Sequence, residues 1–511
     1  MKKSLLLALK GSIYGFMLLV SSICSAASYP TSTATPLATD LSMNQYKLYD
    51  MSDVITKGPW VDARTYNGGV QNDVTINAAI SAIAANKNTL LLAPGTWTIS
   101  NNVTVPSNIN LRFEQGAVLS VGLGYTFTIN GPIDAPLSQV FSGSGTVTFA
   151  QGGIAYPEWW GIDGTADDVQ INLALAAAKK VNLTQTSYSI SAPITVLSGN
   201  ILEGVSRKIQ IVPNAQTFAA ITITGTQTEW QIRNLTITYG PATGNIASTN
   251  PAAIGIKLIT SGPNYPYFFN IDNVSVFYPY SGFHDDTLAF MYNLSNIYVS
   301  TCGYYGFNLK PTAIGGTTIT MTNCYVNSGA GGFRCRNIDG LEMTNCASDN
   351  IVSGNTINYF EMGKVSINGF FAENNTLADF RSILEFAGSI GTVVNYKGAY
   401  NAYNGTTESY GIRCGSSARI DIFGSTNTGE TRSGGGAAYA VIAASDNSHL
   451  TVYSSVFSAP AGATGTGYGI YTANSKANVW NDDYPTLYGG LSVGGGTRIS
   501  NHLSTTATLD F

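Results

Sequence analysis

Ionisable residues recur at nearly regular intervals in the second half of a chain in which only 11% of residues are charged. Six positions each follow an apolar or aromatic residue, at steps of 24, 26, 27, 24 and 28 residues: His284, Asn308, Arg334, Glu361, Glu385 and Arg413. Because successive side chains of a strand point to opposite faces, we predict that these six face outward in one stripe. The stripe would place Glu361 beside Glu385, flanked by Arg334 and Arg413.

A carboxylate pair in such a stripe could carry out acid–base chemistry. Glycosidases use two carboxyl groups, of which one protonates the leaving oxygen and the other acts as base or nucleophile. The neighbouring arginines could hold an anionic sugar through bidentate hydrogen bonds. Alternating Arg and Glu also form weak ion pairs on exposed sheets. The pattern therefore leaves open a working groove and a surface that is only charged.

Asp349 and Glu373 form a second candidate pair. Together with Tyr305 and Asn327 they fall at steps of 22, 22 and 24 residues, so adjacent coils of a repeat would bring the two carboxyl groups together. Two close carboxylates can share a proton, act as acid and base, or bind a divalent cation, which makes calcium a possible cofactor. Ordinary turn chemistry is the alternative.

His284, Asp285 and Asp286 form a dense polar cluster and are a third candidate for catalysis. Aromatic residues of nearby segments, among them Tyr304 and Tyr305, could stack on the C–H face of a sugar ring. They could equally cover a subunit contact, which would make the protein a homo-oligomer.

The elements that position these residues are predicted from a repeat of 22 to 24 residues. Triplets that alternate apolar, polar and apolar residues recur at 274–276, 297–299, 319–321, 341–343 and 365–367. Cys302, Cys324 and Cys346 follow them at the same spacing, and each is preceded by Thr301, Asn323 or Asn345. A strand-rich repeat of this length indicates a solenoid coil. We expect the three thiols to stack in its interior and the preceding residues to form a ladder at a turn.

Two related segments open the chain's ordered part. Asp73 and Asp168 are 95 residues apart, as are Asn77 and Asn172. In each segment the Asp and the Asn stand at the start of an Ala-rich helical pattern, which short strands follow. An internal duplication explains this. We expect a first opening module at 58–155, a second module with the first coils at 156–260, central coils at 261–480 and a C-terminal cap at 481–511. The acidic residues at the helix starts are expected to cap the helices.

The order of an acidic helix start, a short helix, and then Pro94-Gly95-Thr96-Trp97 with repeated strands resembles the opening module of pectate-lyase-like proteins. Bacterial polysaccharide enzymes and phage tailspikes share that module, and the resemblance covers about 60–211. It implies an all-β chain, a right-handed single-stranded parallel β-helix with short N-terminal capping helices. It says little about the reaction, because unrelated chemistries use this scaffold.

The resemblance implies polysaccharide as partner, with two alternatives. The chain is either a polysaccharide lyase or glycoside hydrolase that acts on an acidic or bacterial exopolysaccharide, or a non-catalytic extracellular polysaccharide-binding or structural protein. Lyases of the superfamily use a basic residue as the proton acceptor, with calcium or Arg neutralising the uronate. The polygalacturonase pattern does not fit, because Asp285-Asp286 has no Gly-His-Gly block with it and Arg419-Ile420 precedes Asp421.

The N-terminus has the features of a secretory signal peptide. Lys2 and Lys3 precede an apolar stretch at 5–20 and then small residues, so we expect a signal peptide at 1–27, a flexible leader at 28–57, and a secreted or surface location. No later segment is a credible membrane span. A net charge of −5 excludes the basic surface that nucleic-acid binding requires.

Overall fold

The computed structural model describes residues 60–150, 152–260, 265–309, 315–444, 448–455 and shorter stretches up to 503, together with two strands near the N-terminus. Those two, β1 (Leu41–Met43) and β2 (Tyr46–Leu48), pair antiparallel inside the expected leader. The chain divides into two compact units, 1–59 and 60–511. All that follows concerns the second unit. The predicted signal peptide lies outside the described residues, as does most of the predicted C-terminal cap.

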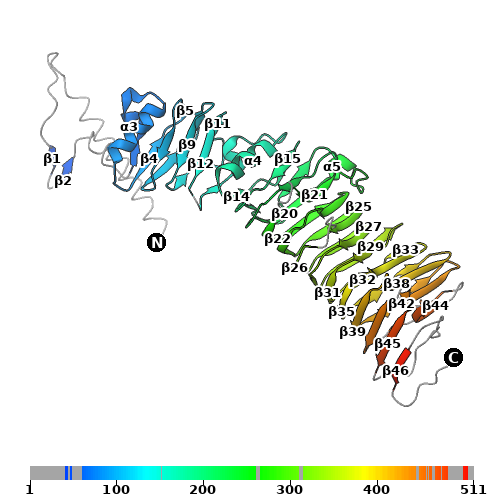
Figure 1. Cartoon of the computed structure of the whole chain (residues 1–511). Coiled ribbons are helices and arrows are strands. Elements are labelled where there is room, and N and C mark those ends of the chain that lie inside the picture. The colour runs from blue at the N-terminus through cyan, green and yellow to red at the C-terminus, as the bar shows by residue number, and fades with distance from the viewer. Residues whose placement is uncertain are drawn as a thin grey trace, which may run out of the picture. The chain divides into compact units, whose positions relative to one another are not determined.

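The second unit begins with short parallel coils (Figure 1). The helix α3 (Asp73–Ile83) lies at their start. Their three small sheets consist of β3 (Trp60–Asp62), β4 (Asn88–Leu92), β7 (Ile109–Phe113) and β10 (Ile133–Asp134); of β5 (Gly95–Ile99), β8 (Ala117–Val121) and β11 (Phe141–Gly143); and of β6 (Val103–Val105), β9 (Thr126–Ile129) and β12 (Thr146–Phe149).

A second helix, α4 (Asp168–Ala177), precedes the main coils, in which every strand pairs in parallel with its equivalent one coil later. We name the three faces of these coils sheets A, B and C. Sheet A consists of β13 (Ile154–Ala155), β14 (Lys180–Leu183), β17 (Ile201–Gly204), the first parts of β20 (Gln231–Thr238) and β22 (Tyr267–Phe277), β24 (Phe290–Ser295), β26 (Ile319–Thr322), β28 (Leu341–Thr344), β31 (Lys364–Asn368), β35 (Ile390–Val394), β39 (Arg419–Phe423), β43 (His449–Tyr453), β45 (Lys476–Asn481) and β46 (Ile499–Leu503).

The other two faces follow sheet A within each coil. Sheet B consists of β15 (Ser187–Ile190), β18 (Gln210–Pro213), the second parts of β20 and β22, the first parts of β25 (Tyr298–Leu309) and β27 (Tyr325–Arg336), β29 (Ala347–Ser353), β32 (Phe371–Glu373), β36 (Lys397–Ala399) and β40 (Thr426–Thr428). Sheet C consists of β16 (Ile194–Thr195), β19 (Ile221–Thr224), β21 (Ile254–Ile259), β23 (Ser281–Asp285), the second parts of β25 and β27, β30 (Asn358–Glu361), β34 (Arg381–Ala387), β38 (Glu408–Gly415), β42 (Ala437–Ala444) and β44 (Gly467–Ala473).

Smaller elements complete the coils. The end of β29 pairs with β33 (Thr376–Leu377), which is followed in the same row by β37 (Ala402–Tyr403) and β41 (Thr431–Arg432), and α5 (Gly240–Thr243) follows β20. The right-handed single-stranded parallel β-helix predicted from the sequence is confirmed. No helix in the described part of the chain is long and apolar enough to cross a membrane.

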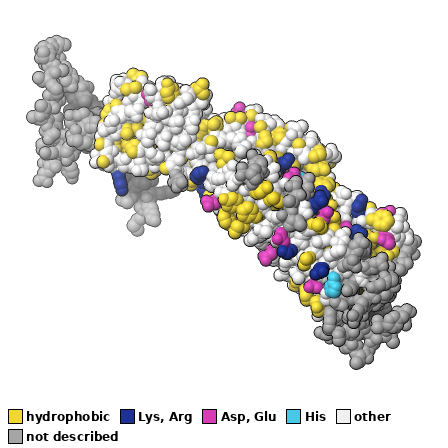
Figure 2. Space-filling view, in the orientation of Figure 1, with side chains coloured by type: hydrophobic (Ala, Val, Ile, Leu, Met, Phe, Trp, Pro, Cys, Tyr) yellow, Lys and Arg dark blue, Asp and Glu magenta, His cyan; other side chains and the backbone are white. Residues whose placement is uncertain are grey.

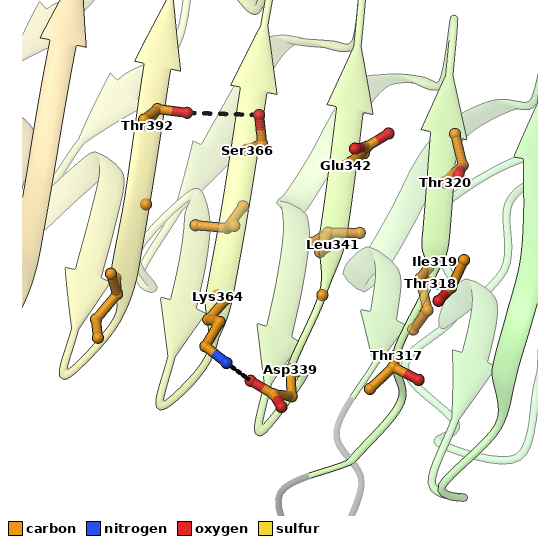
Figure 3. A pocket seen from close by; sticks show the side chains of 14 residues that line it. Thr317, Thr318, Ile319, Thr320, Asp339, Leu341, Glu342, Lys364, Ser366 and Thr392 are labelled. Carbon is orange, nitrogen blue, oxygen red and sulfur yellow. Dashed lines mark hydrogen bonds and ion pairs between the residues drawn. The ribbon is translucent and has the colours of Figure 1, made fainter.

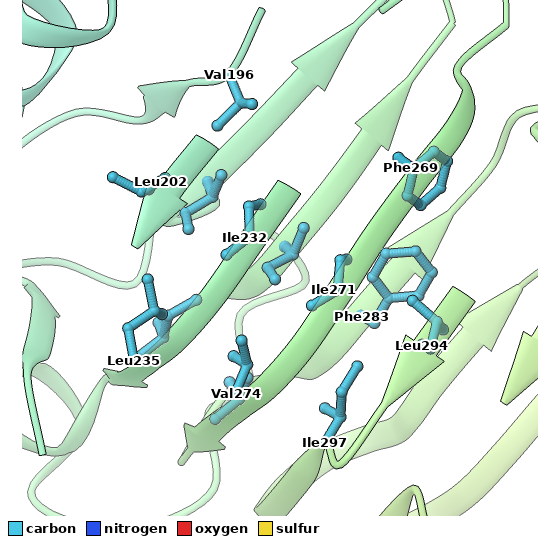
Figure 4. Packing of buried hydrophobic residues seen from close by; sticks show 14 of the residues in the cluster. Val196, Leu202, Ile232, Leu235, Phe269, Ile271, Val274, Phe283, Leu294 and Ile297 are labelled. Carbon is cyan, nitrogen blue, oxygen red and sulfur yellow. The ribbon is translucent and has the colours of Figure 1, made fainter. Parts of the chain in front are cut away.

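The core is built from rows of equivalent apolar residues, one from each coil (Figure 4). Leu202, Ile232, Ile271 and Leu294 form one such row on sheet A. The aromatic rings of Trp230, Phe269 and Tyr292 form another, stacked at centroid distances of 4.1 and 4.4 Å. Aromatic pairs of this kind contribute about 0.5–1.5 kcal/mol each beyond their burial. The rows therefore fix the register between coils.

The turn between sheets A and B carries an asparagine ladder. Asn273, Asn296, Asn323 and Asn345 all have φ between 52° and 54°, in the left-handed region that Asn tolerates better than most residues. The Asn323 amide nitrogen donates to the Asn296 side-chain oxygen at 3.1 Å. The ladder expected for Asn323 and Asn345 is confirmed, but Thr301 does not belong to it. Asn296 takes its place.

The predicted triplet alignment is correct within two groups and wrong between them. The segments 319–321, 341–343 and 365–367 pair on sheet A, whereas 274–276 and 297–299 pair with each other on sheet B. The cause is a longer connection at one point. Nine residues separate the end of β25 from the start of β26, whereas four residues separate the end of β27 from the start of β28.

The same shift corrects the cysteine stack. Cys324 and Cys346 occupy equivalent positions in successive coils, as predicted. Cys302 instead pairs with Gly329, and Ile297 fills the position expected for Cys302. All three thiols are buried.

We expect these thiols to be unreactive in the native protein. Burial raises the pKa of Cys302 to about 11 and that of Cys414 to about 12, so neither forms a thiolate at neutral pH. Mass spectrometry after incubation with a thiol reagent should show no label on the five buried cysteines, and full label after denaturation. Rapid labelling of Cys302 or Cys414 under native conditions would contradict this burial.

The acidic residues at the helix starts make the same contact in both opening modules. Asp73 accepts the backbone N–H of Ser100 at 3.2 Å, and Asp168 accepts that of Ser191 at 2.7 Å. Each carboxylate therefore joins its helix to the residue that follows a strand of the next coil, β5 in the first module and β15 in the second. The expected capping role is wrong in both modules. Asn72 caps α3 by accepting from the Thr75 N–H, and the carboxylates of Asp167 and Asp168 accept from N–H groups outside α4.

Candidate functional site

The predicted polar stripe lies on the outer face of sheet C. His284, Asn308 and Arg334 pair in successive coils, and Glu385 pairs with Arg413. Lys257 precedes His284 in the same row. The exposed part of the row begins at Arg334, because His284 and Asn308 are buried.

Glu361 does not belong to this row. Arg334 pairs with Tyr359, which pairs in turn with Glu385, whereas Glu361 pairs with Arg336 and Ala387. The coil between β27 and β30 is two residues shorter than the spacing of the phenylalanines suggested. A slip of two residues keeps the alternation of inward and outward side chains, so the sequence pattern held no sign of it. Glu361 and Glu385 are therefore not directly paired: they lie diagonally in adjacent coils of the same face, and each is a neighbour of Tyr359.

Arg334 is held by two tyrosines. Its Nη1 donates to the Tyr304 hydroxyl at 2.7 Å, and its guanidinium carbon lies 5.9 Å from the ring centroids of both Tyr304 and Tyr305. Tyr280 stacks on Tyr304 at a centroid distance of 5.3 Å. No carboxylate among the described residues forms an ion pair with Arg334. The predicted binding residues Arg334 and Tyr304 are thus brought together, with guanidinium donors left for an anion.

Tyr305, also predicted to bind substrate, packs against Tyr304 and Arg334. Its side chain is buried, and its hydroxyl donates to the Thr356 carbonyl at 2.8 Å. Its backbone pairs with Gly331, so it does not belong to the row of Asn327 and Asp349 as expected. Ser300 occupies that position.

Glu385 is fully engaged by its neighbours. Its Oε1 accepts from Arg413 at 2.8 Å, and its Oε2 accepts from Thr356 at 2.7 Å and from Ser382 at 3.3 Å. The side chain is only 13% exposed, and that of Arg413 is 29% exposed. Glu385 and Arg413 therefore form a fixed pair that shapes the site, with little freedom for proton transfer.

Tyr359 and Glu361 form the most accessible proton-transfer group on sheet C. Burial and the charges of Glu361 and Glu385 raise the pKa of Tyr359 to about 12, and Glu361 lies two residues further along the same face of β30. Glu361 is anchored on its other side by Arg336, whose Nε lies 3.1 Å from Oε2. Neither Tyr359 nor Arg336 was singled out from the sequence.

The cluster of His284, Asp285 and Asp286 is real but mostly enclosed. His284 Nε2 lies 2.7 Å from Asp286 Oδ2 without the geometry of a hydrogen bond, and Nδ1 contacts the Asn308 amide at 3.0 Å, so both ring nitrogens face a neighbouring side chain. Asp285 faces the core and accepts from Thr287, and burial raises its pKa to about 7. The cluster thus orders the edge of sheet C and does not offer a free base.

Asp349 and Glu373 are adjacent, as predicted, but on sheet B. They pair in successive coils, and the Glu373 N–H donates to Asp349 Oδ1 at 3.0 Å. Burial raises the pKa of Asp349, which is only 8% exposed. This pair cannot act with the sheet C stripe on one substrate bond, because the two lie on different faces. No group of three His, Cys, Asp or Glu side chains within the described residues could hold a metal ion.

Two hollows lie on the outer face of sheet A, and Figure 3 shows one of them. One, with a volume of about 520 Å³, is lined by strands β26, β28, β31 and β35 and crossed at its rim by the Lys364–Asp339 ion pair at 2.8 Å. A Cβ at Gly391 would lie 1.9 Å from the Val365 carbonyl oxygen, so this position admits only glycine. The sequence reasoning missed this face, although its outward residues Thr320, Glu342 and Ser366 are the middle residues of three predicted triplets.

Comparisons with known proteins found distant likenesses among solved structures alone. No protein-family model matches the sequence, and no curated protein matches it. Among solved structures, a tailspike of an Acinetobacter phage is similar over 70% of this chain and 67% of its own, at 14% identity and a TM-score of 0.45. The parallel β-helix that the resemblance implied is shown by the strand pairing of this chain.

Two enzymes also show the likeness. The A-module of a mannuronan C-5 epimerase from Azotobacter vinelandii is similar over 70% of this chain and all of its own, at 13% identity and a TM-score of 0.38. The catalytic domain of a GH87 α-1,3-glucanase is similar over 65% and 66%, at 12% identity and a TM-score of 0.32. Any activity of this chain must therefore be argued from its own residues.

Proposed function

We propose that this protein is an exported polysaccharide lyase that cleaves an acidic polysaccharide across the outer face of sheet C. The observation that carries this is Arg334, a cation without a carboxylate partner in the described part of the chain, one coil from Tyr359. Adjacent coils lie about 4.8 Å apart. A uronate carboxylate bound by Arg334 would thus bring its ring to the Tyr359 hydroxyl.

With Arg334 on the carboxylate and Tyr359 near the C5 proton, the uronate can undergo β-elimination. Arg334 neutralises the uronate carboxylate, which makes the C5 proton more acidic. Tyr359 as phenolate removes that proton, the electron pair forms a C4=C5 double bond, and the C4–O bond breaks. The proton taken up by Tyr359 passes to the leaving glycosidic oxygen. The charge of Glu361 raises the pKa of Tyr359 and so makes its phenolate a stronger base, and the pair of Glu385 and Arg413 holds the next coil in place.

A lyase agrees better with sheet C than a hydrolase does. Hydrolysis needs two available carboxyl groups. Two glutamates of this face are engaged with arginines, Glu361 with Arg336 and Glu385 with Arg413, and the third, Glu408 on β38, accepts a hydrogen bond from Tyr410. The carboxyl pair of Asp349 and Glu373 lies on sheet B, away from Arg334.

Exported location is part of the proposal, since acidic polysaccharides of this kind are extracellular and the N-terminal sequence has the features of a signal peptide. A non-catalytic binding protein is the second candidate, favoured by the extent to which each carboxylate near Arg334 is already bonded.

The test is an assay of the purified protein with alginate, polygalacturonate and hyaluronate. Ultraviolet absorbance reports unsaturated uronates, and a reducing-end assay reports all cleavage. We expect both signals to rise together. Reducing ends without absorbance would establish a hydrolase instead, and retention on a polymer without either signal would establish the binding protein.

A further inference from the structure

We propose that the outer face of sheet A is a second polysaccharide-binding surface, separate from the sheet C site, and that it takes an uncharged glycan chain. We call it the sheet A track. It extends over seven consecutive strands of this face: β20, β22, β24, β26, β28, β31 and β35.

Exposed apolar side chains begin the track. Phe268 is 50% exposed and Met291 is 40% exposed, and they occupy adjacent coils. They border a hollow of about 370 Å³ together with Gln231, Asn270 and Asn293. An exposed aromatic ring beside side-chain amides is suited to a sugar, because the ring stacks on C–H groups while the amides bond to hydroxyls.

The backbone holds these apolar residues outward at a conformational cost. Phe268 and Met291 both have φ of 54°, a left-handed conformation that costs a bulky residue about 1 kcal/mol or more. Glycine or asparagine would fill this turn more readily, as asparagine does at the turn between sheets A and B. The backbone thus presents both side chains to solvent at the start of the track.

A row of polar residues continues the track along the sheet. Asn270, Asn293, Thr320, Glu342, Ser366 and Thr392 pair successively, one per coil. Their spacing of about 4.8 Å is close to the length of one pyranose residue in an extended chain. Successive sugars could therefore meet equivalent hydrogen-bonding groups. The last four residues of this row line the hollow shown in Figure 3.

The charges of the track favour a neutral glycan. Glu229 borders the first hollow and Glu342 the second. The cations described on these strands are paired, Lys364 with Asp339 at 2.8 Å and Arg233 with Glu203 at 3.0 Å. An acidic polysaccharide would meet uncompensated carboxylates here, whereas on sheet C it meets Arg334. Figure 2 shows charged side chains as separate spots with wide uncharged areas between them. The two faces thus differ in the class of polymer that they suit.

The experiment is affinity electrophoresis of the full chain in native gels that contain dextran, galactomannan or mixed-linkage β-glucan. We expect at least one of these neutral polymers to retard the wild type. The double variant Phe268→Ala with Asn293→Ala should bind that polymer at least about tenfold more weakly, the loss expected when a stacked ring and a hydrogen-bonding amide are both removed. Phe380→Ala is the matched control, because Phe380 is 53% exposed with the same φ of 54° but precedes β34 of sheet C.

Two further measurements separate this proposal from its alternatives. Arg334→Ala should leave retardation by the neutral polymer unchanged, even if the lyase proposal fails, because the track does not depend on it. Sedimentation of the wild type and of the double variant reports whether this face binds a second copy of the chain. No retardation by any neutral polymer, equal loss in Phe380→Ala, or an oligomer that the double variant dissociates would each overturn the proposal.

Discussion

Replacing Tyr359 by Phe should lower kcat/KM on an acidic polysaccharide by roughly 10²- to 10⁴-fold, the usual contribution of one positioned proton-transfer group. The variant keeps the ring between Glu361 and Glu385 and removes only the hydroxyl that would accept the C5 proton. Because burial and Glu361 raise the pKa of Tyr359 to about 12, only a small fraction is phenolate at neutral pH. The wild-type kcat/KM should accordingly rise about tenfold per pH unit.

The measurement is the initial rate of absorbance increase from about pH 6 to about pH 9 for wild type, Tyr359→Phe and a control, a range that lies below the pKa of the proposed base. Tyr298→Phe is a suitable control, because its hydroxyl accepts from Asn327 on sheet B and lies outside the site. Arg334→Lys should raise KM, since a lysine loses the planar fork that binds a carboxylate in two places. An undiminished rate in the Tyr359→Phe variant, or a wild-type profile that is flat with pH, would exclude Tyr359 as the base.

Glu430→Gln should stabilise the protein at pH 8 by on the order of 3 kcal/mol relative to wild type. Glu430 ends an interior chain of amides, in which Asn375 donates to Asn401 at 2.9 Å and Asn401 donates to Glu430 Oε1 at 3.0 Å. Its Oε2 is buried without a hydrogen-bond partner among the described residues. Burial raises the pKa of Glu430 to about 7, from an ordinary value of 4.5.

The sign follows from this raised pKa. A carboxyl that keeps its proton in the folded state contributes stability that is complete below pH 4.5 and is lost as the pH rises through 7. Glutamine keeps the carbonyl oxygen for Asn401 and cannot ionise, so the difference between variant and wild type should be small at about pH 4 and reach its full size at about pH 8. Urea unfolding at both pH values measures it.

Glu342→Gln serves as the matched control for this measurement, because Glu342 is exposed on sheet A. Asp285, whose pKa burial also raises, affects wild type and variant alike and cancels in the difference. If Glu430→Gln and Glu342→Gln change stability equally at both pH values, Glu430 is not protonated in the folded protein.

The fold could be predicted from the sequence because a buried row in a β-helix demands the same residue type once per coil. The inward positions of Cys324 and Cys346 and the left-handed asparagines at 323 and 345 repeat for that reason. The same pattern could not reveal turn lengths. The longer connection after β25 moved Cys302 and Thr301 out of their expected rows, although each remained in a position that its type allows.

The site was predicted in part for the same reason. Arg334, Glu385 and Arg413 were assigned to one face correctly, because alternation fixes which side a residue faces. Their neighbours depend on register, and a shift of two residues replaced Glu361 by Tyr359 beside Glu385. The pattern also could not predict which outward side chains are buried. His284 and Asn308 stand at outward positions of their strands, yet both are buried.

The two-residue shift between β27 and β30 has a further meaning for how such a surface can change. An even insertion or deletion in a turn leaves every inward side chain inward, so the core stays the same while the outer face acquires new neighbours across one coil boundary. In this protein the length of the turn places Glu361 beside Arg336, and it places Tyr359 in the row of Arg334 and Glu385. The length of a turn thus determines which outward side chains become neighbours in adjacent coils. In proteins of this architecture, a change of turn length can therefore bring existing side chains together in a new site while the core remains the same.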